Sequence, residues 1–337
     1  MIVDNSDPSD LPAQAWETIQ VPESIGWSKT GLLQVQDYGE QIHSFAGLLV
    51  SHGRVLASWG QITHPVSCRS IRKALLSSLY GIHMAAGHIR LEWTLEDVGI
   101  DDTPPSLTPQ EKQATIADLL TSCSGVYHLS NYQTAQDRAR LPQRGSHASG
   151  TFWYYNNWDF NALGTIYERL TGTRIFEEFE RCIARPLQMQ DYRVEDMRYL
   201  IQEDSLHPSY AFRLSARDLA RFGLLYLQQG YWRRQSVIAP HWIGVSTTAH
   251  AQTPSGSGFG YLWWVCSQGH LFYDMILPDR AYASYGFGGQ YLLVIPSLGL
   301  VVVHLGDPDE PRYRPPNAEQ ACHLLQLILQ ASRHKSL

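Results

Sequence analysis

Stretches typical of β-strands lie at both ends of this chain, and stretches typical of α-helices fill its middle. Short apolar runs rich in β-branched and aromatic residues predict strands near the start, at 44–60, and again at 258–265, 270–277, 288–296 and 298–306. Apolar residues spaced three and four apart predict amphipathic helices at 70–86, 108–125, 160–172, 175–187, 215–230 and 317–334. This order predicts one sheet built from both termini, with a mostly helical insertion between its halves.

We therefore expect an α/β (α+β) fold in a single domain over residues 1–337, in which helices flank an antiparallel sheet. The expected sheet lobe takes about 1–68 plus 215–337, and the helical lobe about 69–214. Within the first strand pair, His52-Gly53 predicts a tight hairpin turn, because glycine adopts the positive φ that such a turn needs. A polar stretch at 126–150 predicts a long loop, which in a compact domain is often functional.

Charge and composition exclude several classes of partner. The net charge is −6 and no basic run occurs, so we expect no nucleic-acid binding. No stretch of about 18 apolar residues predicts a membrane span. The first residues, MIVDNSDPSDLPAQAW, lack the features of a signal peptide, so we expect a cytoplasmic protein with five reduced, mostly buried cysteines. Ten tryptophans and 18 tyrosines are more than a core needs, which indicates an aromatic cleft.

Metal and cofactor signatures are missing from the sequence. The 14 histidines are scattered, and no H-E-x-x-H, His-x-His or C-x-x-C pattern occurs. Gly286 and Gly288 begin a G-x-G-x-x-G pattern, but Tyr291 occupies its last position, and G-x-S-x-G is also missing. We expect no metal and no cofactor.

A serine and a lysine three residues apart open the first predicted helix of the middle region, in Ser70-Ile71-Arg72-Lys73. Positions three apart share one helix face, so Ser70 and Lys73 are expected to point the same way. Burial lowers the pKa of a lysine, which then takes a proton from a serine, and the free N–H groups of a helix start hold an oxyanion. The pattern recurs from Ser332 to Lys335 on the tail, but Lys73 is one of only four lysines and lies in an apolar helix, where an idle charge is costly.

The stretch GTFWYYNNWDFNALG brings a tyrosine and an asparagine two residues apart to the start of another predicted helix. A phenol beside a lysine relays protons, and an amide binds a substrate carbonyl. Two registers fit this pattern, Tyr154 with Asn156 and Tyr155 with Asn157, and an aromatic core turn is the structural alternative.

A third stretch, YGFGGQYLLVIP, places Gly286, Gly288 and Gly289 at the opening of a strand. Glycine in a strand lets another group approach the backbone, so a substrate along this edge would meet a main-chain N–H donor. A β-bulge or turn is the structural alternative.

In this order, the three motifs resemble those of the serine β-lactamase and penicillin-binding protein superfamily. They are most similar to its class C-like branch, with esterases, D-aminopeptidases and 6-aminohexanoate-dimer hydrolases. The likeness runs roughly from Phe45 to the final helix and includes LTSCSGVYH, SARDLARFGLLYL and GLVVVHLG. The family's second motif continues with an aromatic residue and Leu-Gly, as Phe160, Leu163 and Gly164 do here, which selects Tyr155 and Asn157.

The resemblance implies a β-lactamase/transpeptidase-like fold and a serine hydrolase that forms an acyl-enzyme on an ester or amide bond of a small molecule, with β-lactams among the candidate substrates. Ser70 would be the nucleophile, Lys73 its general base and Tyr155 the proton shuttle, while Asn157 would orient Lys73 and the substrate carbonyl. The oxyanion hole would combine the N–H of Ser70 with one near Phe287 or Gly288.

The chain departs from the family in the third motif, where Lys-Thr/Ser-Gly is usual. The corresponding stretch, Tyr285-Gly286-Phe287-Gly288, holds no cation for a substrate carboxylate, which favours a neutral ester or amide. Residues expected to shape the pocket are Tyr127, His128, Trp153 and Trp158. The alternative is a penicillin-binding-like or ligand-binding protein that acylates slowly or not at all.

Overall fold

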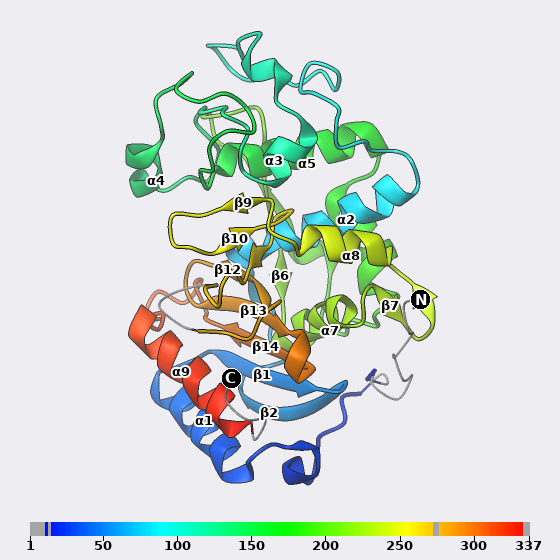
Figure 1. Cartoon of the computed structure of the whole chain (residues 1–337), viewed down its shortest axis with the longest axis vertical. Helices are drawn as coiled ribbons and strands as arrows, with labels where there is room; N and C mark the ends of the chain where they lie inside the picture. Colours follow the sequence, from blue (N-terminus) through cyan, green and yellow to red (C-terminus); the bar gives the residue numbers. More distant parts are fainter. Residues whose placement is uncertain (1–10, 13–14, 272–275, 333–337) are drawn as a thin grey trace.

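An eight-stranded antiparallel sheet forms the centre of the fold in the computed structural model, which describes residues 11–12, 15–271 and 276–332 (Figure 1). Its strand order is β2-β1-β14-β13-β12-β11-β10-β9. The strands are β1 (Ala46–Ser51), β2 (Arg54–Gly60), β9 (Ala251–Gln252), β10 (Gly258–Phe259), β11 (Trp264–Val265), β12 (Tyr282–Gly286), β13 (Gln290–Ile295) and β14 (Leu300–Leu305). Because β1 pairs with β14, the two ends of the chain meet in one sheet, and the predicted fold class is confirmed.

The hairpin that joins β1 to β2 has the predicted turn. His52 and Gly53 both adopt positive φ, 47° and 67°, as a two-residue turn between twisted strands requires. The strands pair from Ala46 with Gly60 to Ser51 with Arg54.

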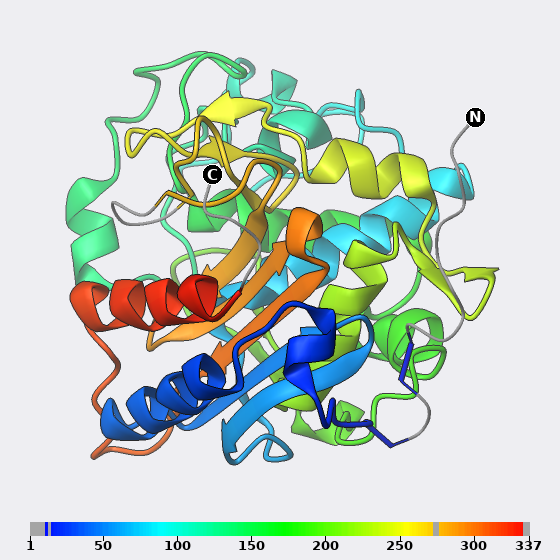
Figure 2. The ribbon, with the colours of Figure 1, turned by 60° about the horizontal axis from the view of Figure 1, so that its bottom comes forward.

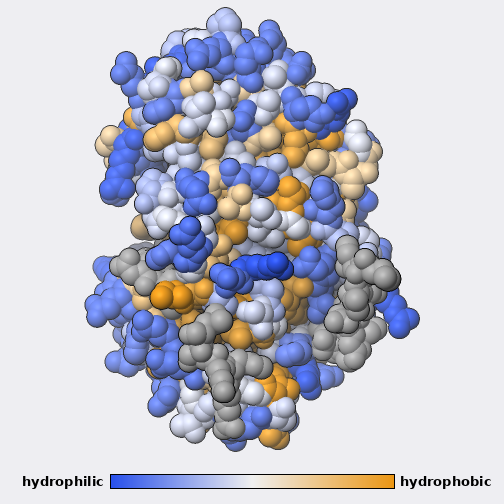
Figure 3. All heavy atoms as spheres, viewed as in Figure 1, coloured by the Kyte–Doolittle hydropathy of each residue, from blue (hydrophilic) through white to orange (hydrophobic). Residues whose placement is uncertain are grey.

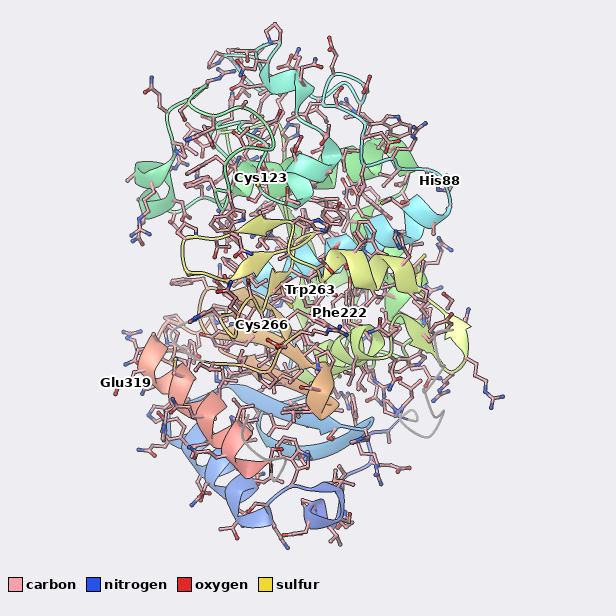
Figure 4. The ribbon with its side chains drawn as sticks, in the orientation of Figure 1. His88, Cys123, Phe222, Trp263, Cys266 and Glu319 are labelled. Atoms are coloured by element: carbon pink, nitrogen blue, oxygen red, sulfur yellow. The ribbon has the colours of Figure 1, made fainter. Side chains whose placement is uncertain are left out.

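The sheet is covered on both faces, and its strands alternate between the two cores. In β14, Val301 and Val303 face a core that includes α7 (Ala216–Leu227), whereas Leu300 and Val302 face α1 (Lys29–Gln41) and α9 (Ala318–Ala331). Figure 2 shows α1 and α9 side by side against the sheet. On the α7 side, Phe222 and Trp263 stack with ring centroids 6.2 Å apart (Figure 4).

The remaining helices include α2, whose residues are nearly all buried. The helices are α2 (Arg72–Ala85), α3 (Ile116–Leu120), α4 (Ala135–Arg140), α5 (Asn157–Thr171), α6 (Ile175–Phe179) with a following π-helical turn (Glu180–Ala184), and α8 (Pro240–Ser246). A helix that is buried on every side serves as the core of its region rather than as a cover.

Several predicted boundaries were wrong. The helix expected at 108–125 is a 3₁₀ turn (Glu111–Gln113) followed by the short α3, because the capping box of Thr115 and Asp118 starts a new helix. The loop expected at 126–150 contains α4. The strand expected at 258–265 is split into β10 and β11.

The other described strands form three short pairs: β3 (Val66–Ser67) with β6 (Arg213–Leu214), β4 (Arg198–Leu200) with β5 (Ser209–Ala211), and β7 (Tyr231–Trp232) with β8 (Gln235–Ser236). Half of the strand expected at 270–277 falls on residues 272–275, which lie outside the described residues.

The described part of the chain contains no helix long and apolar enough to cross a membrane. Within the same ranges, no cluster of histidine, cysteine, aspartate and glutamate side chains has the arrangement of a metal site. Two cysteines, Cys68 and Cys123, are buried, and the other three are half-buried. Hydrophilic residues separate the apolar patches on the face drawn in Figure 3.

Candidate active site

A cavity of about 740 Å³ opens where α2, the loop before α5, and strand β12 meet. Its aromatic lining residues are Tyr132, Tyr155, Trp264, Tyr285 and Phe287, and its charged ones are Arg69, Arg72, Lys73 and Asp137. The other lining residues are Ser67, Ser70, Gln133, Thr134, Gln136, Asn157, Gln202, Ser209 and Ala211. The aromatic cleft expected from the tyrosine and tryptophan content is therefore present.

Ser70 and Lys73 meet in this cavity, with Lys73 Nζ 2.8 Å from Ser70 Oγ. Ser70 lies in a 3₁₀ turn (Arg69–Ile71) that runs directly into α2, rather than in the α-helix itself. The 3₁₀ turn and the first turn of α2 are continuous, so residues three apart still lie on one face and the hydroxyl of Ser70 faces the amine of Lys73.

The amine of Lys73 is enclosed by apolar groups, since the side chain is only 3% exposed. Nζ lies 4.9 Å from the ring centroid of Tyr155 and 4.7 Å from that of Phe160. Burial holds the pKa of Lys73 well below its usual value, and the charge of Arg72 lowers it further, while Asp137 opposes the shift. An amine with a depressed pKa is able to accept the proton of a neighbouring hydroxyl.

The structure separates the two registers of the second motif. Tyr155 and Asn157 line the cavity with Ser70 and Lys73. The hydroxyl of Tyr154 instead donates to the carbonyl of Asp137 at 3.3 Å, and the buried Asn156 caps α5. Burial raises the pKa of Tyr155 to about 12, against the effects of Ser70 and Arg72, so its phenol stays protonated at neutral pH.

The third motif approaches Ser70 through the backbone. A Cβ on Gly286 would lie 2.7 Å from Ser70 N and 3.0 Å from the carbonyl oxygen of Cys68, so only glycine fits. Gly286 ends β12, and Phe287, Gly288 and Gly289 form the turn to β13. The three glycines therefore lie at the end of β12 and in the turn that follows it, and not at the opening of a strand as predicted. Phe287 directly follows Gly286, the residue whose backbone lies against Ser70 N.

Gly286→Ala is expected to reduce kcat about 100-fold, because the added methyl group displaces the backbone beside Ser70 N, one of the two proposed oxyanion donors. Ester hydrolysis with matched circular dichroism spectra checks this. Gly244→Ala is the control, because a Cβ there meets nothing within 4 Å, and it should keep parental kcat. Parental kcat in Gly286→Ala would contradict the close fit.

One wall of the cavity is a column of aromatic rings. Trp264 stacks on Tyr155 at 5.9 Å and on Tyr285 at 4.7 Å between centroids. Trp153 packs behind this column, 5.7 Å from Trp264, but is not a lining residue.

Three residues expected to shape the pocket do not line the cavity and instead contact other residues of the helical region. Trp158 is fully buried and donates from Nε1 to Asp102 Oδ2 at 2.6 Å. The His128 ring contacts the carbonyl oxygen of Pro105 at 3.0 Å, and the Tyr127 hydroxyl contacts His147 at 3.1 Å. Their sequence proximity to the motifs therefore does not place them on the cavity wall.

Sequence reasoning missed Arg69, Arg72 and Trp264 as lining residues. Arg72 belongs to the Ser-Ile-Arg-Lys motif, and its charge at the start of an apolar helix could have identified it as a lining residue. Arg69, directly before Ser70, has a positive φ of 49°, and no sequence pattern predicted this backbone conformation. Trp264 reaches the site only through the pairing of β11 with β12.

Comparisons with known proteins identify a family for this chain. The sequence profile of the Beta-lactamase family matches residues 69–321. No curated protein matches the chain.

Several solved structures share the fold. A Bacillus anthracis protein described as a 6-aminohexanoate-dimer hydrolase is 16% identical, with 96% of this chain and 88% of that chain covered and a TM-score of 0.69. An octameric penicillin-binding protein homologue from Pyrococcus abyssi is 19% identical, with 91% and 78% covered and a TM-score of 0.66. A class C β-lactamase variant is 13% identical, with 94% and 99% covered and a TM-score of 0.65.

The family profile spans most of the chain, and its match begins one residue before the serine that faces the buried lysine. The chain therefore belongs to the Beta-lactamase family.

Proposed function

We propose that this protein is a serine hydrolase that cleaves an ester or amide bond of a small molecule through an acyl-enzyme on Ser70. The observation that carries the proposal is the buried amine of Lys73, 2.8 Å from Ser70 Oγ, with a depressed pKa. A serine hydroxyl is a weak nucleophile until a neighbouring base removes its proton, and an uncharged lysine amine supplies that base.

In the acylation step, each proton passes between named groups of the site. Lys73 takes the proton of Ser70 as Oγ attacks the substrate carbonyl, and the N–H groups of Ser70 and Phe287 receive the oxyanion. Tyr155, protonated because its pKa is about 12, gives its proton to the leaving group and regains one from Lys73. A water molecule repeats the sequence in reverse to release the acid and free Ser70.

Asn157 occupies the cavity wall at the first residue of α5. We assign it to the substrate carbonyl or amide, because an amide side chain supplies both a donor and an acceptor.

Time-resolved hydrolysis of p-nitrophenyl butyrate tests the proposal. Steady release of p-nitrophenol that depends on Ser70 supports turnover. A single burst without a steady phase supports the alternative, a protein that acylates without turning over. No release of p-nitrophenol from this ester, together with no hydrolysis of amides or penicillins, would contradict the hydrolase proposal.

A further inference from the structure

Arg72 is a buried cation in the catalytic cavity that the proposed chemistry does not use. It is the first residue of α2, lies between Ser70 and Lys73 in the sequence, and is 6% exposed. It also lines the cavity. Its charge lowers the pKa of both Lys73 and Tyr155, so its field reaches the reacting groups.

Only neutral groups hold this guanidinium. Arg72 Nη2 donates to Asn161 Oδ1 at 2.8 Å, and Cζ lies 4.2 Å from the ring centroid of Tyr210. The amide of Asn161 is itself fixed, because its Nδ2 donates to the carbonyl of Asn131 at 3.0 Å. Arg72 Nη1 is buried and makes no hydrogen bond within the described residues.

No carboxylate of the described chain pairs with Arg72. Arg69, the other guanidinium on the wall, has Asp309 at 3.9 Å. Asp137 lines the same cavity, but its Oδ2 accepts hydrogen bonds from the backbone N–H and hydroxyl of Thr134 and caps α4. With Lys73 acting as an uncharged base, as proposed, the wall described here carries two guanidinium groups against one carboxylate.

A buried charge without a counter-ion is costly, and a fixed guanidinium with a spare N–H donor matches a carboxylate. We propose that Arg72 binds a carboxylate of the substrate, so that the enzyme acts on carboxylate-bearing esters or amides. The inference rests on the proposed hydrolase function and names its substrate class. The third motif favoured a neutral substrate because β12 supplies no cation. Arg72 supplies one from α2 instead, so the proposed substrate carries a carboxylate.

The test compares esters with and without a carboxylate. The first pair is mono-p-nitrophenyl glutarate and its terminal amide, p-nitrophenyl glutaramate, with spontaneous hydrolysis subtracted. A third ester, 3-carboxy-4-nitrophenyl butyrate, carries the carboxylate on the leaving group and is compared with p-nitrophenyl butyrate. In the parent, kcat/KM for one of the two carboxylate esters should exceed that of its neutral counterpart about tenfold or more. A preference for the glutarate ester assigns the carboxylate to the acyl side of the substrate, and a preference for the carboxynitrophenyl ester assigns it to the leaving group.

Arg72→Gln should bring this ratio close to one. Both esters use the same Ser70 and Lys73, so any effect of the substitution on the pKa of Lys73 cancels in the ratio. Arg69→Gln is the matched control, since Arg69 lies on the same wall and already faces Asp309, and it should keep the parental ratio. A ratio near one in the parent for both arms, or a preference that persists in Arg72→Gln, overturns the inference.

A measurement on the parent alone keeps the inference testable if Arg72→Gln does not fold. Free glutarate should inhibit hydrolysis of p-nitrophenyl butyrate at least about tenfold more strongly than glutaramide does. Equal inhibition by the two compounds counts against Arg72. Ser70-dependent hydrolysis of the neutral esters without any carboxylate preference leaves the hydrolase function intact and removes only the assignment of Arg72.

Discussion

Replacing Lys73 with methionine is expected to lower kcat about 1,000-fold or more while making the protein more stable at neutral pH. The loss of activity follows because the base 2.8 Å from Ser70 Oγ is removed. The gain in stability follows because an amine enclosed by Tyr155 and Phe160 is replaced by an apolar chain of similar length.

The sign of the stability change depends on pH in a defined way. The unfolded chain binds a proton at Lys73 up to its ordinary pKa of 10.5, whereas burial makes the folded chain release that proton at a much lower pH. Between these two values the unfolded state holds the extra proton, so the fold loses stability as pH falls from 10.5 toward the lowered pKa. Lys73→Met abolishes this loss, and its advantage should shrink as pH rises to 10.5.

Thermal unfolding of parent and variant at neutral pH and near pH 10 measures this difference, which should be at least about 2 °C at neutral pH. Lys29→Met is the control, because Lys29 is exposed, and it should alter neither melting temperature nor kcat. A lower melting temperature for Lys73→Met at neutral pH, or parental kcat, would show that the amine is a charged, structural group.

Local sequence patterns were sufficient to predict much of the fold. β1 and β14 are short, continuous runs of buried and mostly apolar residues, and the His52-Gly53 turn is a two-residue signal, so both were predictable. The helix α1 was not predicted, because Gly31 and Gly39 weaken its local preference. Its stability comes from tertiary packing instead: a Cβ at Gly31 would lie 2.9 Å from Ala331 Cβ, so glycine allows α1 to approach α9 closely.

The same distinction applies to the candidate site. Ser70 and Lys73 are three residues apart, so helical spacing alone predicts their meeting. The approach of Gly286 to Ser70 N depends on how β12 packs against the turn before α2, and the position of Trp264 depends on strand pairing. Such contacts between distant segments have no local signature. The second serine–lysine pattern stays untested, since Lys335 lies outside the described residues.

Ser70→Ala is expected to have the largest effect, a loss of about 10,000-fold or more in kcat for ester hydrolysis, because no acyl-enzyme forms without the hydroxyl. A fluorophosphonate should add to the parent on the peptide that contains Ser70 and leave Ser70→Ala unlabelled. Ser78→Ala is the matched control on α2, since its hydroxyl donates to the carbonyl of Leu75 at 2.6 Å, and it should keep parental kcat.

The double variant Ser70→Ala/Lys73→Met separates a catalytic unit from two independent residues. If Lys73 acts only through the hydroxyl of Ser70, its removal costs nothing further once that hydroxyl is gone, and the double variant should equal Ser70→Ala. Losses that multiply would mean that Lys73 stabilises the transition state independently of Ser70. An adduct on any other residue, with Ser70→Ala still active, would place the nucleophile elsewhere and remove the proposed mechanism.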